Sequence, residues 1–100
     1  VDIDRTDRVP VARVSGEIDR ANAAEVEPAL MALVPGPAVV DLSALAFLSS
    51  AGVQILLGLA RRCVRLAIVA PPDAAFRRAL EVAELGRVAR LADSLADALR

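Results

Sequence analysis

The sequence contains no histidine, tyrosine or tryptophan, and all 12 of its basic residues are arginine, so lysine is absent as well. Without histidine, neither a Ser-His-Asp triad nor an imidazole metal ligand can form. Without lysine, the phosphate-binding lysine of a P-loop and a Schiff-base nucleophile are excluded. No pair of carboxylates has a spacing typical of acid–base catalysis. We therefore expect no enzyme activity, no cofactor and no bound metal ion.

Aromatic residues and cysteine are also scarce. Phe47 and Phe76 are the only aromatics, which disfavours a platform for stacking nucleic-acid bases. A net charge of −1 and a pI of about 5.3 disfavour general nucleic-acid binding. The lone Cys63 cannot form an internal disulfide and is typical of a small core residue in a reducing compartment. The apolar runs are too short to span a bilayer, and no signal-peptide pattern opens the chain. These features predict a cytoplasmic protein that binds neither nucleic acid nor membrane.

The residues that are present favour one α/β domain over residues 1–100, because 56% of the chain is hydrophobic. Apolar runs predict strands at Val1–Asp4, Val9–Ile18, Val39–Leu42, Val64–Ala70 and Arg87–Leu91. Helices are expected after Asn22, over Ser50–Arg62, after Asp73 and after Ser94. The first two strands should pair as a hairpin, and the helical crossovers indicate parallel pairing for the rest. The prediction is a mixed, mostly parallel sheet with helices chiefly on one face.

Polar residues at the ends of these elements have mostly structural interpretations. Asn22 followed by Glu25 resembles a capping box, and Asp73 is a candidate cap for the third helix. Asp19 is either a turn former or a partner contact. We expect Asp41 to be structural, accepting backbone N–H bonds that hold the turn at Ser49 and Ser50 and its connection to the strand, with no direct role in binding.

The segment Ser49-Ser50-Ala51-Gly52 is the most informative feature of the chain, because it places two hydroxyls where an apolar helix begins. A serine at this position commonly caps free backbone N–H groups. A phosphate there would meet the same N–H groups and the positive end of the helix dipole. Phosphorylation adds about two negative charges, so a serine at this point is a plausible switch. The sequence leaves open which serine caps and which points outward.

The helix after the serines has a wide apolar arc. Its inner face carries Val53, Leu56, Leu57 and Ala60, whereas Ile55 and Leu59 lie off that face. Either a neighbouring helix covers these two residues, or they form an exposed patch for a partner. Gly52 either allows the close approach of a partner or relieves a tight turn.

Four segments together resemble the STAS domain family, of the bacterial anti-sigma-factor antagonist type. Gly16–Asp19 is similar to the family's Gly-Glu-Leu/Ile-Asp, and Val39–Ser43 to its strand ending in Asp-Leu-Ser. Phe47–Val53 resembles the segment around the family's switch serine, and Leu80–Val88 the stretch after its third helix. The four occur in the family's order, and the resemblance covers almost the whole chain.

The resemblance implies a protein-binding switch without catalysis. An unphosphorylated family member binds an anti-sigma factor, often a serine kinase, and thereby frees a sigma factor; a phosphatase reverses the phosphorylation. The phosphorylated serine corresponds to Ser50. The family usually has Asp where this chain has Ser49, which makes Ser49 the alternative site.

The partner surface is then expected to include Asp19, Ser49, Ser50, Ala51, Gly52 and Ile55, on a monomer or weak dimer. The rival interpretations are a STAS module in a lipid-transport or sensor assembly and a nucleotide-sensing domain.

Overall fold

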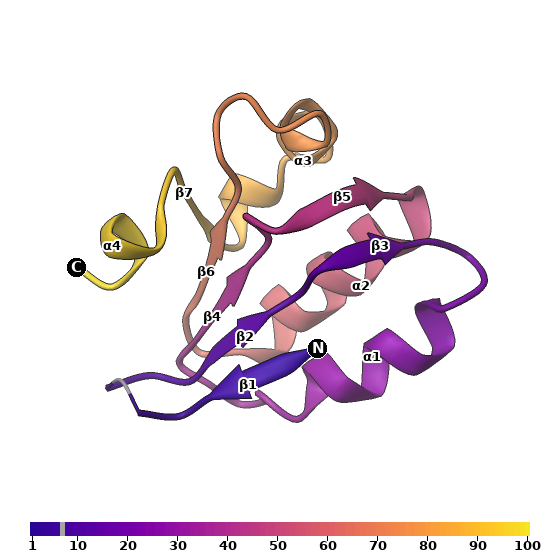
Figure 1. The fold of residues 1–100 in the computed structure, drawn as a ribbon. Helices are drawn as coiled ribbons and strands as arrows, with labels where there is room; N and C mark the ends of the chain where they lie inside the picture. Colours follow the sequence, from indigo (N-terminus) through magenta and orange to yellow (C-terminus); the bar gives the residue numbers. More distant parts are fainter. Residues whose placement is uncertain (7) are drawn as a thin grey trace.

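Residues 1–6 and 8–100, which the computed structural model describes, contain a five-stranded sheet in the order β1-β2-β4-β6-β7 (Figure 1). The strands are β1 Asp2–Asp4, β2 Val11–Arg13, β4 Ala38–Asp41, β6 Leu66–Val69 and β7 Arg90–Ala92. β1 pairs with β2 in antiparallel orientation, and every other neighbouring pair in this sheet is parallel. The predicted hairpin and the mostly parallel sheet are therefore confirmed.

A second, two-stranded parallel sheet joins β3 (Gly16–Ile18) to β5 (Leu45–Leu48). The prediction of one continuous strand over Val9–Ile18 is wrong, because the chain leaves β2 and turns at Gly16, whose φ of 77° suits glycine. The strand β5 was not predicted. Its buried residues, Leu45 and Leu48, are three positions apart, so they lack the two-residue period of a strand.

The described residues form four α-helices, of which α1 and α2 lie together on one face of the sheet (Figure 1). The helices are α1 Ala23–Met31, α2 Ser50–Arg62, α3 Arg77–Val82 and α4 Leu95–Ala98, with a 3₁₀ turn over Leu85–Arg87. The one-turn α4 packs on the opposite face. This arrangement agrees with the prediction of helices chiefly on one face. No helix in the described part of the chain is long and apolar enough to cross a bilayer.

The core has two layers, because β4 is buried on both faces. Val40 faces the larger cluster between the sheet and helices α1, α2 and α3. Val39 faces a smaller cluster that α4 partly covers with Leu95 and Leu99. A strand buried on both sides is typically a continuous apolar run, which is why the sequence predicted β4 to within one residue at each end.

Three predicted boundaries are wrong. β6 begins later than the predicted Val64, whose side chain is 72% exposed. A 3₁₀ turn occupies the start of the predicted strand Arg87–Leu91. Asp73 does not cap α3, which begins at Arg77, because a turn closed by the bond from Arg77 N–H to the Ala74 carbonyl comes between them. The predicted cap Ser94 does accept a bond from the N–H of Asp97, at 3.1 Å.

Candidate functional site

Ser49 is the cap of α2. Its hydroxyl oxygen accepts a hydrogen bond from the N–H of Gly52 at 3.3 Å. Its carbonyl accepts from the N–H of Val53 at 3.1 Å, and its own N–H donates to the carbonyl of Ile18 at 2.9 Å. The half-buried Ser49 is thus held between the end of β3 and the first turn of α2. The capping role that the sequence left open between the two serines belongs to Ser49.

Ser50 is the first residue of α2 and is exposed. Within the described residues, its hydroxyl makes no hydrogen bond. The first turn of α2 carries no acidic residue, so the partial positive charge at this helix end is not offset by a carboxylate of its own first turn. The site therefore combines an unused, accessible hydroxyl with a helix end that favours added negative charge.

Gly52 is buried by the domain's own side chains. A Cβ added there would lie 2.4 Å from Cδ1 of Leu48 and 3.0 Å from Cγ2 of Ile18. Neither of the two explanations offered by the sequence, a partner or a tight turn, accounts for this glycine. Glycine is needed because the start of α2 packs directly onto the ends of β3 and β5.

Of the two alternatives for the wide apolar arc of α2, a covered face and an exposed patch, the structure shows the covered face. Ile55 is only 6% exposed and Leu59 is fully buried, because the domain's core covers the wide apolar arc of the helix. Ile55 is consequently a core residue and has little surface to offer a partner. Ala51, beside the serines, is half-buried and keeps some exposed surface.

Asp19 and Asn22 form a reciprocal cap beside Ser49. Oδ1 of Asp19 accepts from the N–H of Asn22, and Oδ1 of Asn22 accepts from the N–H of Asp19, both at 2.9 Å. The N–H of Ala23 also donates to the Asp19 carbonyl, so helical hydrogen bonding begins at Asp19. α1 begins directly after Asn22, as predicted, but the predicted capping box with Glu25 does not form, because the Asn22 side chain bonds back to Asp19.

Asp41 shapes the connection that leads from β4 into β5. This carboxylate is only 6% exposed, and its Oδ1 accepts the N–H of Ser43 at 3.0 Å and the Ser43 hydroxyl at 2.6 Å. A carboxylate that bonds to the backbone two residues on is a common turn device. The prediction that Asp41 accepts a backbone N–H bond is confirmed, but the turn that it holds leads into β5 and is not the turn at Ser49 and Ser50.

Phe47 is a surface residue to which the sequence analysis gave no role. Its side chain is 49% exposed on β5, two positions before Ser49. Beside it lies a small hollow of about 190 Å³, lined by Ala46, Phe47, Leu48, Ala75, Phe76 and Ala79. In the sequence, the only indication of a role for Phe47 was its place in the motif around the serines. Its exposure could not be expected, because strand β5 was not predicted.

The described residues offer little other chemistry. No group of three or more cysteine and acidic side chains among them could hold a metal ion. Cys63 is half-buried at the end of α2, and this burial raises the pKa of its thiol above the usual value. A raised pKa keeps the thiol protonated and weakly nucleophilic near neutral pH.

A family model described as "Mlab, STAS domain" matches residues 1–97. The chain belongs to the STAS domain family. Its relatives include the anti-sigma-F factor antagonist RsfB of two Mycobacterium tuberculosis strains, CDC 1551 and H37Rv. Each is 36% identical over 97 residues, covering 91% of this chain and 79% of the relative. These relatives place this STAS domain with the anti-sigma-factor antagonists.

Solved structures agree with this assignment. An anti-sigma factor antagonist from Mycobacterium paratuberculosis superposes with a TM-score of 0.87 at 36% identity, over 97% of this chain and 87% of that one. The anti-sigma factor antagonist SpoIIAA in its unphosphorylated form has a TM-score of 0.66 at 17% identity, over 97% and 91% of the two chains. The second likeness shows the fold alone.

Proposed function

We propose that this STAS domain is an anti-sigma-factor antagonist, which binds an anti-sigma factor and frees a sigma factor. The similarity to RsfB over nearly the whole chain supports this function. The observation that carries the proposal is the division of work at the start of α2, where Ser49 caps and the exposed Ser50 keeps its hydroxyl free. The protein acts in the cytoplasm, by binding and without catalysis, as a monomer or weak dimer.

The switch in this proposal is phosphorylation of Ser50 by a serine kinase, which is the anti-sigma factor itself. The hydroxyl of Ser50 is accessible, whereas that of Ser49 is half-buried and bonded to the N–H of Gly52. A phosphate on Ser50 leaves the cap intact and is favoured by the helix end. Modification therefore changes the surface that a partner meets without unfolding the helix, and a phosphatase can restore it.

The proposed partner surface surrounds Ser50 and consists of Asp19, Ser49, Ser50, Ala51 and the exposed Phe47. The unmodified surface is small and nearly uncharged at the serines. A phosphate adds about two negative charges to it. Burying that charge against a partner without a matching cation would cost several kcal/mol, on the order of a buried unpaired ion. The unmodified form therefore binds the partner, and the phosphorylated form is released.

Ser49 provides this cap without charge. Asp and Ser cap helices about equally well, so the serine here maintains the helix start that the family's aspartate would provide. A carboxylate at position 49 would stand beside the phosphate of Ser50 and repel it. The neutral Ser49 avoids that repulsion and therefore favours phosphorylation of Ser50.

The test compares Ser50→Glu with Ser50→Gln, which have nearly the same size and differ in charge. Binding to the cognate anti-sigma factor is measured by titration calorimetry. We expect Ser50→Ala and Ser50→Gln to bind close to the wild type, and Ser50→Glu to bind about tenfold more weakly or worse, because only the glutamate buries a charge. Equal affinities for the glutamate and glutamine variants would contradict a charge-based switch.

A second candidate follows from the family model's description, which names the Mlab STAS domain. In that case the same surface binds a partner that is not a kinase, in another assembly such as a lipid-transport complex. Binding that depends on Phe47 but is insensitive to charge at Ser50 would favour this candidate over the antagonist.

A further inference from the structure

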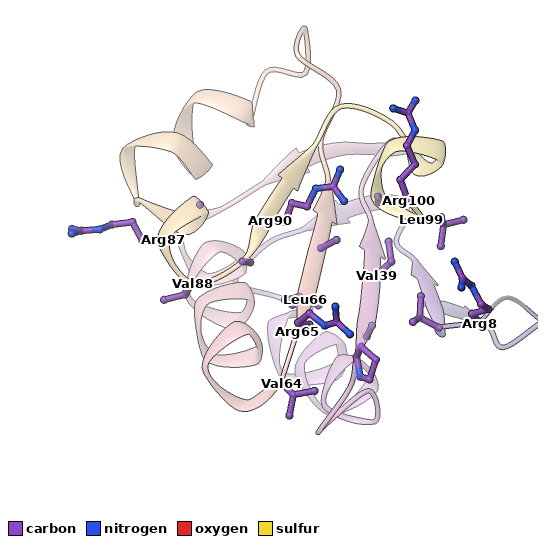
Figure 2. A pocket seen from close by; sticks show the side chains of 17 residues that line it. Arg8, Val39, Val64, Arg65, Leu66, Arg87, Val88, Arg90, Leu99 and Arg100 are labelled. Atoms are coloured by element: carbon purple, nitrogen blue, oxygen red, sulfur yellow. The ribbon is translucent and has the colours of Figure 1, made fainter.

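A cleft of about 970 Å³ lies away from the serines, at the end of the sheet where β4 and β6 begin (Figure 2). Its walls come from the start of these two strands, the 3₁₀ turn and β7, and the last residues of the chain. Five arginines are among its lining residues: Arg8, Arg65, Arg87, Arg90 and Arg100. Among residues 1–6 and 8–100, no acidic side chain lines it.

The positive charge of this cleft is local. The whole chain has a net charge of −1, yet five of its 12 arginines border this one hollow. Figure 2 shows Arg65 and Arg90 over the strands in the middle of the cleft, whereas Arg87 points away from it. Clustered charge of one sign in a concave surface raises the local concentration of the opposite charge.

The arginines in the cleft are only partly used by the domain itself. Arg90 forms an ion pair with Asp97 at 2.9 Å, and Arg87 pairs with Glu84 at 2.9 Å. Among residues 1–6 and 8–100, neither Arg65 nor Arg100 forms an ion pair. At least two guanidinium groups at the cleft are therefore available to an incoming carboxylate.

The cleft is also apolar between these charges. Val39, Leu66 and Ala67 line it from the strands, and Leu99 lines it from the end of α4. Two valines of the lining have exposed side chains, Val64 at 72% and Val88 at 42%. A ligand that matches this surface needs carboxylates for the arginines and aliphatic groups for the strand residues and the two valines.

We propose that the cleft is a docking groove for an acidic, partly apolar segment of a partner protein. Arginine binds carboxylates with two parallel hydrogen bonds, and it is enriched at protein interfaces. Peptide side chains present carboxylates and aliphatic groups in alternation, which suits a groove whose arginines are spread over several chain segments. The groove is separate from Ser50, so this inference stands independently of the proposed switch.

The test is a titration of the ¹⁵N-labelled protein with a short synthetic peptide in which glutamate and leucine alternate, followed by NMR. Saturable shifts are expected at the amides of Arg65, Arg90 and Val39, with none at Ser50. The matched peptide with glutamine in place of glutamate should bind about tenfold more weakly, because it lacks the charge-assisted hydrogen bonds. Added salt should weaken binding of the glutamate peptide, since exposed charges are screened.

Variants then assign the binding to the groove. Arg8→Ala combined with Arg65→Ala should weaken binding of the glutamate peptide about fivefold or more. The control is Arg61→Ala combined with Arg78→Ala, which removes the same charge from two exposed residues outside the groove and should change little. The spectra of both double variants report whether the fold is retained.

Four results would overturn the proposal. The first is equal binding of the glutamate and glutamine peptides, and the second is equal weakening by the two double variants. The third is binding of anionic lipid vesicles in place of the peptide. The fourth is dimerisation in sedimentation experiments that is lost with Arg8→Ala and Arg65→Ala, since the groove would then hold a second copy of this chain.

Discussion

Two helices of this STAS domain begin side by side, and their first turns are built differently. β3 and β5 pair in parallel, β3 leads to the start of α1, and β5 leads to the start of α2. Before α1, the side chains of Asp19 and Asn22 each bond to the other's backbone N–H. At α2, Ser49 alone provides the cap, and the neighbouring Ser50 is left over. Both polar side chains before α1 are thus used in capping, whereas at α2 one serine caps and the other stays available for modification.

The electrostatics of the two helix starts differ in the same direction. α1 has Glu25 in its first turn and Asp19 just before it, so its positive end already faces negative charge. α2 has no acidic residue in its first turn. An added phosphate would meet repulsion at α1 and attraction at α2. Of the two neighbouring turns, only the one with the serines is suited to a phosphate.

The largest expected effect comes from the packing that supports the α2 start. Gly52→Val should lower the free energy of unfolding by about 3 kcal/mol, because overpacking forces Leu48 and Ile18 to move. The matched control is Gly58→Ala, where a Cβ would meet only Cε of Met31, at 3.9 Å. That variant should be stabilised by up to about 1 kcal/mol through helix propensity. Urea denaturation measures both, and a stable Gly52→Val would show that α2 is not tightly packed on β3 and β5.

The reciprocal cap of α1 ranks second. Asp19→Ala should lower the free energy of unfolding by about 1–2 kcal/mol, since it removes a cap and leaves the N–H of Asn22 without its acceptor. Glu25→Ala, at an exposed position in the same first turn, serves as the control and should change stability by less than about 0.5 kcal/mol. Equal losses in the two variants would contradict a special role for Asp19 in the turn.

Substitutions of the two serines should change the free energy of unfolding by smaller amounts, which differ between the two positions. Ser49→Ala should lower the free energy of unfolding by about 1 kcal/mol through loss of the cap, and Ser49→Asp should retain most of the stability. Ser50→Ala should change it by less than about 0.5 kcal/mol, since the Ser50 side chain is exposed. Thermal melts of the three variants decide the matter, and a larger loss for Ser50→Ala than for Ser49→Ala would reverse the assignment of the cap.

The sequence predicted the parts of this picture that depend on long apolar patterns. The buried run at β4 and the amphipathic α2 were identified, and with them the position of the serines at a helix start. Ser49 and Ser50 could not be told apart, because adjacent serines have the same capping preference and only the register against Ile18 selects one. A similar ambiguity explains the wrong prediction for the cap of α1, because the pairs Asp19–Asn22 and Asn22–Glu25 both have the spacing of a capping box.

Other errors came from contacts between segments distant in the chain. β5 exists as a strand because β3 provides its partner, and no local pattern reveals that pairing. The apolar arc of α2 had two readings, an exposed patch or a covered face, and packing within the domain buries Ile55 and Leu59. Phe47 gained its exposed position from the same unpredicted strand.

The most direct test of the central claim, that Ser50 is the surplus and modifiable hydroxyl, is to map the phosphate after incubation with the cognate kinase and ATP. Mass spectrometry of the wild type should find one phosphate, on Ser50, and the phosphorylated protein should lose binding to the anti-sigma factor. Ser50→Ala should accept no phosphate, whereas Ser49→Ala should still accept it. A phosphate on Ser49, or unchanged binding by protein phosphorylated on Ser50, would contradict the account.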